Sequence, residues 1–295
     1  MSKITDYAAV TTLAAANVFL VDGANGTKTI SALNAAKSLA ALLPNDDLFA
    51  MLDEIGSPIL HRQIYRGKNL GTSFTSAQKA QIAAGTFKGI WLGDYWVINS
   101  VTYVVADFDY WYHCGDTDFA KHHIVVIPSA NMYNAKMNDS NVTTGGYYGS
   151  KMRGVEVEGT FTPYAEGCGL YNALTAFQAA FGDALLTHRE YLCNAVEDGK
   201  ESAGAWFDSI VDLPSEIMMY GTSIRTASPR IATIGKSQLA LMAASPKFIF
   251  PSRSYTWLRD VVSAALFALV ANYGFAGDYY ASNSYGVRPV AAVGG

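Results

Sequence analysis

A cluster of potential metal ligands lies near the middle of the chain. It consists of His113, Cys114, Asp116, Asp118 and the adjacent pair His122 and His123. Imidazole and thiolate are the ligands that zinc prefers in proteins. The two adjacent histidines precede an apolar run typical of a strand, where neighbouring side chains point to opposite faces. Only one of them can then face the same ion as His113. The sequence therefore favours partly buried histidines bonded to backbone or aspartate over a zinc site, and we expect no metal or other cofactor.

Two further groups of polar residues are candidates for catalysis. Glu156 and Glu158 lie two apart on a predicted strand and so share a face, and most glycosidases use a pair of carboxylates. Such a pair on one exposed strand face is more often solvated. His188-Arg189-Glu190 contains a potential base without an accompanying nucleophile, and we expect Arg189 and Glu190 to pair with charges elsewhere. Because phosphate-loop, nucleophile-elbow and HExxH motifs are also missing from the sequence, we expect no enzymatic activity.

The carboxy-terminal segment has the most unusual composition. From residue 261 to residue 295 only Asp278 and Arg288 are charged, and eight aromatic residues lie within residues 255–285. Tyrosine supplies contact area at low entropic cost while serine and asparagine supply hydrogen bonds, so this mixture is typical of adaptable binding surfaces. The alternative is that these side chains fill the core. We expect core positions for Trp257, Leu258, Phe267 and Val287, and exposed positions for Asn272, Tyr273, Tyr279, Tyr280 and Asn283.

The overall composition narrows the classes of function. The 295 residues are 50% hydrophobic, 16% charged and carry a formal net charge of −4. Globular proteins average about a quarter charged residues, so the surface is predicted to be unusually neutral. The negative charge and the lack of a Lys/Arg run disfavour nucleic-acid binding. The most apolar window, residues 261–271, is roughly half the length that a membrane-spanning helix needs, so we expect no membrane insertion.

The amino terminus and the cysteines indicate a reducing compartment. Residues 1–6 lack the basic start and continuous apolar core of a signal peptide, so we expect the chain to stay in a cytoplasm or leave without the secretion machinery. Cys114, Cys168 and Cys193 are odd in number and widely spaced, which predicts reduced thiols rather than a disulfide framework.

Local patterns predict a mixed α+β domain over residues 59–295. The helices are indicated by a capping box and by apolar spacings of three and four, and the strands by alternating β-branched and aromatic residues. The glycines at 274, 277 and 286 predict loops between residue 255 and the final strand. The expected elements are a helix from Thr75 to Gly85, a hairpin over 95–108 turning at Asn99-Ser100, a strand over 124–127, an amphipathic helix over 170–181 ended by Gly182, short helices over 215–219 and 236–243, and a strand over 287–290.

Residues 1–58 form a compositionally separate segment. A short strand is predicted at Val18, followed by the hairpin-turn signals Asp22-Gly and Asn25-Gly. From Thr29 to Ile55 apolar residues recur at helical spacing on two predicted helices separated by Pro44. The resulting narrow apolar stripe has no core of its own. It either packs on the main domain or, as we favour, serves self-association or docking.

Several motifs, in order, resemble a C-type-lectin-like domain found in bacteriophage tail and virion-surface proteins. That fold also occurs in the variable proteins of diversity-generating retroelements and in formylglycine-generating enzymes. The motifs span about residues 61–295. They are Gly93-Asp-Tyr-Trp96, Ala106-Asp-Phe-Asp-Tyr110, Cys114-Gly-Asp-Thr117, residues 122–128, Gly145-Gly-Tyr, His188-Arg-Glu with Asn194-Ala-Val, Trp257-Leu-Arg-Asp260 and Gly286-Val-Arg-Pro289. The calcium and sugar triplets of true C-type lectins and the paired cysteines of the formylglycine-generating enzymes are missing from the sequence.

The resemblance implies a scaffold that presents one irregular, loop-rich face to a ligand. In diversified relatives the varied positions lie between two strands. One strand carries the motif that corresponds to Trp257-Leu-Arg-Asp260, and the other carries the motif that corresponds to Gly286-Val-Arg-Pro289. The implied ligand contacts here are Ala264, Ala265, Asn272, Tyr273, Phe275, Asp278, Tyr279, Tyr280, Asn283 and Tyr285. Residues 257–259 and 286–289 would be framework, with Arg288 in a buried charge-assisted contact to Asp260 or Asp107.

We therefore expect a phage receptor-binding protein, made in the host cytoplasm and carried on the particle surface. Its neutral aromatic face would bind a host-surface protein or glycan. Residues 1–58, whose start resembles short phage anchoring segments, would contact other virion tail proteins, and the relatives imply a homotrimer. The alternative is a head-fibre or decoration protein with a purely structural role.

Overall fold

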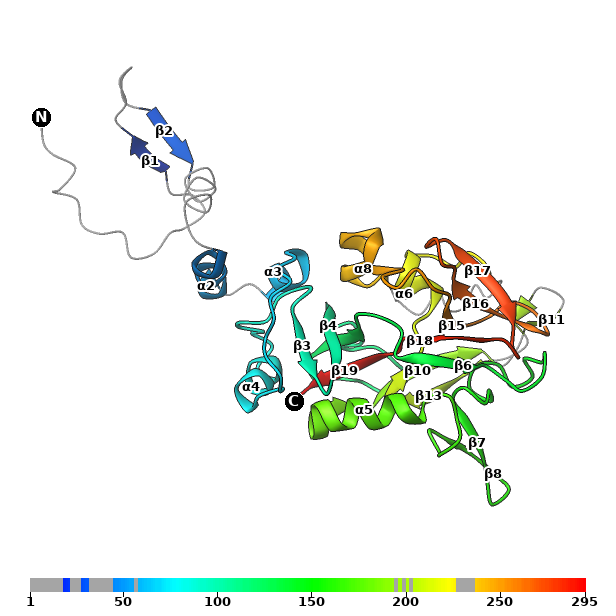
Figure 1. Cartoon of the computed structure of the whole chain (residues 1–295). Coiled ribbons are helices and arrows are strands. Elements are labelled where there is room, and N and C mark those ends of the chain that lie inside the picture. The colour runs from blue at the N-terminus through cyan, green and yellow to red at the C-terminus, as the bar shows by residue number, and fades with distance from the viewer. Residues whose placement is uncertain are drawn as a thin grey trace, which may run out of the picture. The chain divides into compact units, whose positions relative to one another are not determined.

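The computed structural model describes residues 18–21, 28–31, 45–55, 58–193, 196–197, 200–201, 204–226 and 237–295 (Figure 1). The chain divides into two compact units, Met1–Gly56 and Ser57–Gly295. Within the described ranges, no helix combines the length and the hydropathy needed to cross a membrane. Helices and mostly antiparallel strands are both present, so the fold is mixed α+β.

The first unit contains a hairpin and a helix. Strands β1 (Val18–Val21) and β2 (Lys28–Ser31) pair antiparallel, which confirms the predicted strand. The turn signals predicted after it, at residues 22–23 and 25–26, lie outside the described residues. The prediction of a helix from Thr29 is wrong at its start, because β-branched Thr29 and Ile30 pair with Leu20 and Phe19 across the hairpin. The continuation of that prediction over residues 32–44 lies outside the described residues. Helix α2 (Asn45–Ile55) confirms the helix expected after Pro44.

A six-stranded sheet forms the centre of the second unit. Its strands are β3 (Tyr95–Ile98), β4 (Val101–Phe108), β5 (His123–Pro128), β9 (Leu185–Leu186), β14 (Val211–Asp212) and β19 (Val290–Gly294). The predicted hairpin is confirmed, since Asn99 and Ser100 connect β3 and β4 with φ angles of 49° and 66°, the positive values that a type I′ turn requires. Every residue of β5 is buried, as expected for its continuous apolar run.

A second, five-stranded sheet has the order β17-β16-β15-β18-β6. Its strands are β6 (Tyr133–Lys136), β15 (Thr256–Val261), β16 (Leu266–Val270), β17 (Ala276–Tyr280) and β18 (Ser284–Val287). The prediction of loops after residue 255 is confirmed at Gly274, which lies in the turn between β16 and β17, but it is wrong at Gly277 and Gly286, which lie within β17 and β18. Position 286 of β18 requires a glycine because a Cβ there would collide with the side-chain amide of Asn131. The predicted final strand is also misplaced, since Arg288 and Pro289 only connect β18 to β19.

Helices and smaller hairpins complete this unit. The helices are α3 (Pro58–Gln63), α4 (Ser76–Ala83), α5 (Tyr171–Phe181), α6 (Glu216–Tyr220) and α8 (Ala240–Ala244), with 3₁₀ turns η2 (Gly182–Ala184) and η3 (Pro246–Phe248). The hairpins pair β7 (Gly154–Val157) with β8 (Thr160–Pro163), β10 (His188–Cys193) with β13 (Gly204–Ser209), and β11 (Val196–Glu197) with β12 (Lys200–Glu201). Thr75 makes both hydrogen bonds of the predicted capping box of α4. The helix predicted over 236–243 begins only at Ala240, and residue 236 lies outside the described ranges.

One continuous hydrophobic core connects the two sheets and α5. Phe177 and Phe181 of α5 pack edge-on against Tyr103 of β4, with ring centroids 5.0 and 5.1 Å apart. The expected core positions are confirmed, because Trp257, Leu258, Phe267 and Val287 are all fully buried. Cys114 and Cys168 are free thiols, and the side chain of Cys193 lies outside the described residues.

Candidate functional site

The predicted ligand contacts lie at two ends of the β16–β17 hairpin. Ala264 and Ala265 lie in the turn that precedes β16. Asn272, Tyr273 and Phe275 lie on or beside the turn that follows it, so a strand of five residues, about 17 Å long, separates the two groups. Asp278, Tyr279 and Tyr280 lie on the edge strand β17, Asn283 in the turn after it and Tyr285 on β18. The structure thus distributes the predicted face over several elements rather than gathering it at one point.

The exposed aromatic side chains follow this edge. Tyr273 is 78% exposed and Phe275 59% exposed at one end of the hairpin, and Tyr280 is 52% exposed at the other. Tyr279 is also exposed, as expected for all three tyrosines. Asn272 and Asn283, which were expected to be exposed, are only half-buried. Three other predicted contacts, Ala265, Asp278 and Tyr285, are half-buried as well, whereas Ala264 is exposed.

A tyrosine cluster consists of Tyr279 on β17, Tyr285 on β18 and Tyr255 directly before β15. The ring centroid of Tyr285 lies 5.0 Å from that of Tyr255 and 5.1 Å from that of Tyr279, and the rings of Tyr255 and Tyr279 are 5.9 Å apart. Tyr285 also meets buried Trp257 edge-on at 5.1 Å. The Asn283 side-chain amide donates to the Tyr285 hydroxyl at 3.3 Å. Edge-on contacts of this kind hold the rings in fixed orientations.

Burial of the ring is the main cause that raises the pKa of Tyr285, and the hydrogen bond with Tyr279 raises it further. The phenol therefore stays neutral at physiological pH. Sequence reasoning missed Tyr255, although it belongs to the aromatic run that suggested a binding surface. Only the pairing of β15 with β18 brings it beside Tyr285.

The acidic residue on the edge strand is neutralised. Asp278 forms an ion pair and a hydrogen bond with Arg225, a residue that the sequence did not single out. The loop carrying Arg225 is held by the buried carboxylate of Glu216, which accepts hydrogen bonds of 2.9 to 3.1 Å from the backbone N–H groups of Ile224, Arg225 and Thr226. The edge therefore presents aromatic and amide groups without a net charge.

Buried charges support the sheet beneath the cluster. Arg259 of β15 donates to Glu190 of β10 at 3.0 Å, and the indole N–H of Trp111 donates to the same carboxylate at 2.7 Å. On the surface, Arg189 pairs with Asp116 and with Asp208, each at 2.8 Å. These contacts confirm that Arg189 and Glu190 pair with charges elsewhere in the fold.

The prediction that Arg288 contacts the carboxylate of Asp260 or Asp107 is wrong. Its guanidinium is buried and donates at 2.7 Å to the backbone carbonyls of Pro128 and Phe248, not to a carboxylate. Asp107 instead pairs with Arg62 at 2.5 Å, and Asp260 accepts from the backbone N–H of Glu216 at 2.6 Å. Burial without an acidic partner lowers the pKa of Arg288 to about 9.

The histidine-rich segment forms ordinary hydrogen bonds. His113 bonds Asp118 at 2.6 Å and His122 bonds Asp109 at 2.8 Å, through Nδ1 in both cases. His123 is buried, which lowers its pKa to about 3, and its Nδ1 lies 2.9 Å from the carbonyl of Lys121. Among the residues with described positions, no group of three or more His, Cys, Asp or Glu is arranged to hold a metal. The interpretation of these histidines as bonded to backbone and aspartate is confirmed.

The carboxylate pair does not form either. Glu156 lies on β7, but Glu158 lies in the following turn with a φ of 51°, so the two side chains do not share a strand face. Both are exposed, and the prediction of a shared face is wrong because the strand ends one residue too early.

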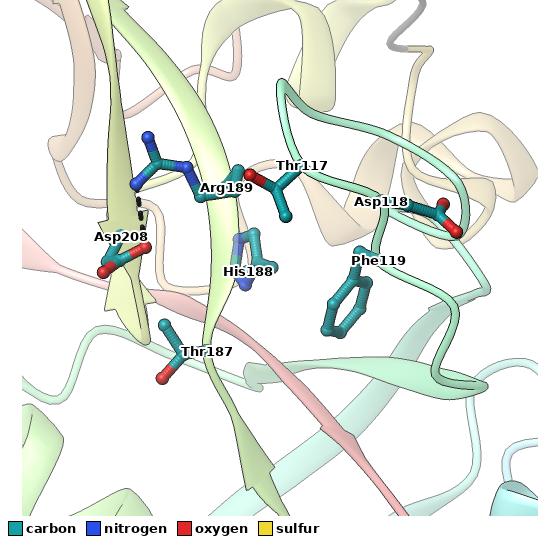
Figure 2. A pocket seen from close by; sticks show the side chains of 7 residues that line it. All are labelled: Thr117, Asp118, Phe119, Thr187, His188, Arg189 and Asp208. Carbon is teal, nitrogen blue, oxygen red and sulfur yellow. Dashed lines mark hydrogen bonds and ion pairs between the residues drawn. The ribbon is translucent and has the colours of Figure 1, made fainter.

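A cavity of about 290 Å³ lies between the segment 117–119 and strands β10 and β13. Figure 2 shows the side chains that line it. Its lining residues are Thr117, Asp118, Phe119, Thr187, His188, Arg189 and Asp208. The charged groups in it are already paired, Arg189 with Asp208 and Asp118 with His113. This cavity therefore offers few groups for a ligand compared with the tyrosine cluster. No protein-family model, curated protein or solved structure matches this chain.

Proposed function

We propose that this chain is a receptor-binding protein on the surface of a bacteriophage particle, with a C-type-lectin-like domain. The observation that carries the proposal is the tyrosine cluster, three aromatic rings whose centroids lie 5.0 to 5.9 Å apart on the second sheet. Its neighbouring carboxylate, Asp278, is neutralised by Arg225. A neutral aromatic edge of this kind suits a host-surface protein or glycan recognised by stacking and hydrogen bonds.

The arrangement of the two carboxy-terminal motifs supports this choice of fold. The motifs at 257–260 and 286–289 are far apart in sequence, yet Thr256 of β15 pairs in parallel with Gly286 of β18. All the framework residues in both motifs are buried. Strands β15 and β18 thus belong to the same sheet as β17, which carries exposed Tyr279 and Tyr280, and a binding site held on such regular elements is what a display scaffold requires.

Single contacts of this type are weak, so the proposal includes a homotrimer whose copies bind together. Linking several sites raises the overall affinity without a new contact. Residues 1–58 would supply the contacts between copies and to other tail proteins. Size measurement of the purified full chain tests this part, and a monomer at about micromolar concentration would contradict it.

The receptor role is tested by binding of labelled full-length protein to cells of the bacterium that the phage infects. Tyr279→Ala removes an exposed ring, and we expect about tenfold weaker binding because truncation of an aromatic anchor typically costs more than 1 kcal/mol. Val157→Ala on β7 is the matched control, since it removes an equally exposed apolar side chain far along the chain from the cluster. Equal binding by both variants would refute the role of the cluster.

The structural alternative makes a different prediction for adsorption of the phage itself. A receptor-binding protein in excess competes with the particle for its receptor, whereas a decoration or head-fibre protein leaves adsorption unchanged. Failure to compete, together with normal adsorption of particles that lack the protein, would favour the structural role.

A further inference from the structure

Two adjoining cavities are lined by residues at the start of β4, on and before β6, and at the start of α5. One has a volume of about 300 Å³ and the other about 240 Å³. Both are lined by Tyr133 and Asn172, so together they form one groove, and none of the three cluster tyrosines lines it. Ligand cavities in proteins range from roughly 300 to 1,000 Å³, so the two halves together fall within this range although the smaller half alone does not.

The larger cavity is lined by uncharged polar groups that are free to bind. Ser100, Thr102, Ser129 and Asn172 are among the residues that line this cavity. Their side chains make no hydrogen bond with any other described residue. Hydroxyls and amides both donate and accept, which matches the hydroxyl groups of a sugar, and no titratable carboxylate, amine or imidazole lines this half.

The ring of Tyr133 forms a fixed wall between the two halves. Its hydroxyl donates to the carbonyl of Gly169 at 2.7 Å and accepts from the backbone N–H of Ala173 at 3.0 Å. These two bonds lock the ring in place before a ligand arrives, so its apolar face costs no ordering entropy on binding.

The smaller cavity carries a net positive charge. Lys136, Lys151 and Asp139 line it. Lys151 pairs with Asp139 at 2.7 Å, which leaves the charge of Lys136 in excess. Lys136 forms no ion pair within the described part of the chain and lies on the exposed side of β6. Lys136 also acts electrostatically on Asp139, but two lysines against one aspartate leave one positive charge in excess, which favours an anionic group in this half.

We propose that this groove is a second binding site, for an acidic oligosaccharide in which a neutral sugar unit adjoins an anionic one. The neutral unit lies among the free hydroxyls and Asn172, and the anionic unit lies at Lys136. The site does not rest on the proposed receptor role of the tyrosine cluster, because the two share no lining residue.

The test uses the full-length protein with two defined probes, a hyaluronan tetrasaccharide, which alternates neutral and acidic sugars, and neutral chitotetraose. Calorimetry and saturation-transfer NMR should detect the acidic probe with a dissociation constant in the millimolar range or below, and the neutral probe about fivefold weaker. Asn172→Ala should weaken both probes about fivefold through the lost hydrogen bonds, while Lys136→Ser should weaken the acidic probe alone.

Two control variants share the chemistry but lie outside the groove. Gln178→Ala is exposed on the same helix as Asn172, and Lys121→Ser removes an exposed lysine, so neither should change binding. The proposal is overturned if neither probe binds at about 10 mM, a concentration well above the expected range. It is also overturned if Asn172→Ala binds as the wild type does, or if Tyr279→Ala abolishes binding, since the sugar would then occupy the cluster.

Discussion

Asp260 makes the stability of this protein fall as the pH rises through the acidic range. The side chain is buried on β15, and burial, together with the negative charge of Glu216, raises its pKa from 3.8 to about 7, while Arg259 opposes the rise less strongly. Between these two values the folded chain holds a proton that the unfolded chain has released. Its contribution to stability is therefore complete below pH 3.8 and is lost as the pH rises through about 7. The pKa difference corresponds to at most ~4 kcal/mol.

Asp260→Asn isolates this effect, because the amide is neutral at every pH and its oxygen still accepts from the Glu216 backbone N–H. The free energy of unfolding of the variant, minus that of the wild type, should increase by up to ~4 kcal/mol between about pH 4 and about pH 8. Asp260 Oδ1 is buried without a hydrogen-bond partner among the described residues. An amide nitrogen at the position of Oδ1 lowers the free energy of unfolding of the variant by about 1–3 kcal/mol. Because this cost is the same at both pH values, it does not affect the predicted increase between them.

Urea unfolding followed by tryptophan fluorescence measures both proteins at each pH. Asp139→Asn is the control, since Asp139 is exposed and its pKa is lowered, mainly by the hydrogen bond from Lys151. A lowered carboxyl pKa has the opposite sign, because that stability is present above pH 3.8 and lost as the pH falls. A difference between Asp260→Asn and wild type that stays constant with pH, or decreases as the pH rises, would refute the reasoning.

Two further substitutions test the scaffold around the cluster. Glu190→Gln leaves Arg259 buried without its negative partner and should lower the free energy of unfolding by about 3–5 kcal/mol. A loss below about 1 kcal/mol in urea unfolding would contradict a buried ion pair at this position. Gly274→Ala should lower the thermal midpoint, because φ is 90° there and a Cβ would collide with the ring of Phe250. Gly167→Ala, with a φ of 96° and no neighbour within 4 Å, should lower it less, and equal shifts would exclude the collision as the cause.

The elements that could be predicted from sequence depend on signals close together in the chain. The capping box at Thr75 closes within three residues, and the turn at Asn99-Ser100 involves only its two flanking strands. The spacing of apolar residues over 170–181 reports the buried face of α5 directly. Each of these features is decided by local backbone preferences and by which side faces the core.

The second sheet could not be predicted, because its strands are stabilised by distant partners. β18 pairs with β6, and the register aligns Gly286 with Asn134, about 150 positions earlier in the chain. A glycine that signals a loop to local rules is needed there because Asn131 occupies the space of its side chain. Strand propensity depends on such neighbours more than on the residue itself.

By itself, the sequence determined the chemistry of the carboxy-terminal segment: aromatic, amide-rich and almost uncharged. The tertiary structure decided which of those residues act together. It separated Ala264 from Tyr273 by a strand length, joined Tyr255 to Tyr279 and Tyr285, and gave Asp278 a partner in Arg225. It also surrounded Arg288 with carbonyls in place of a carboxylate. Composition is a property of the chain, whereas contacts between distant residues exist only once the strands have paired.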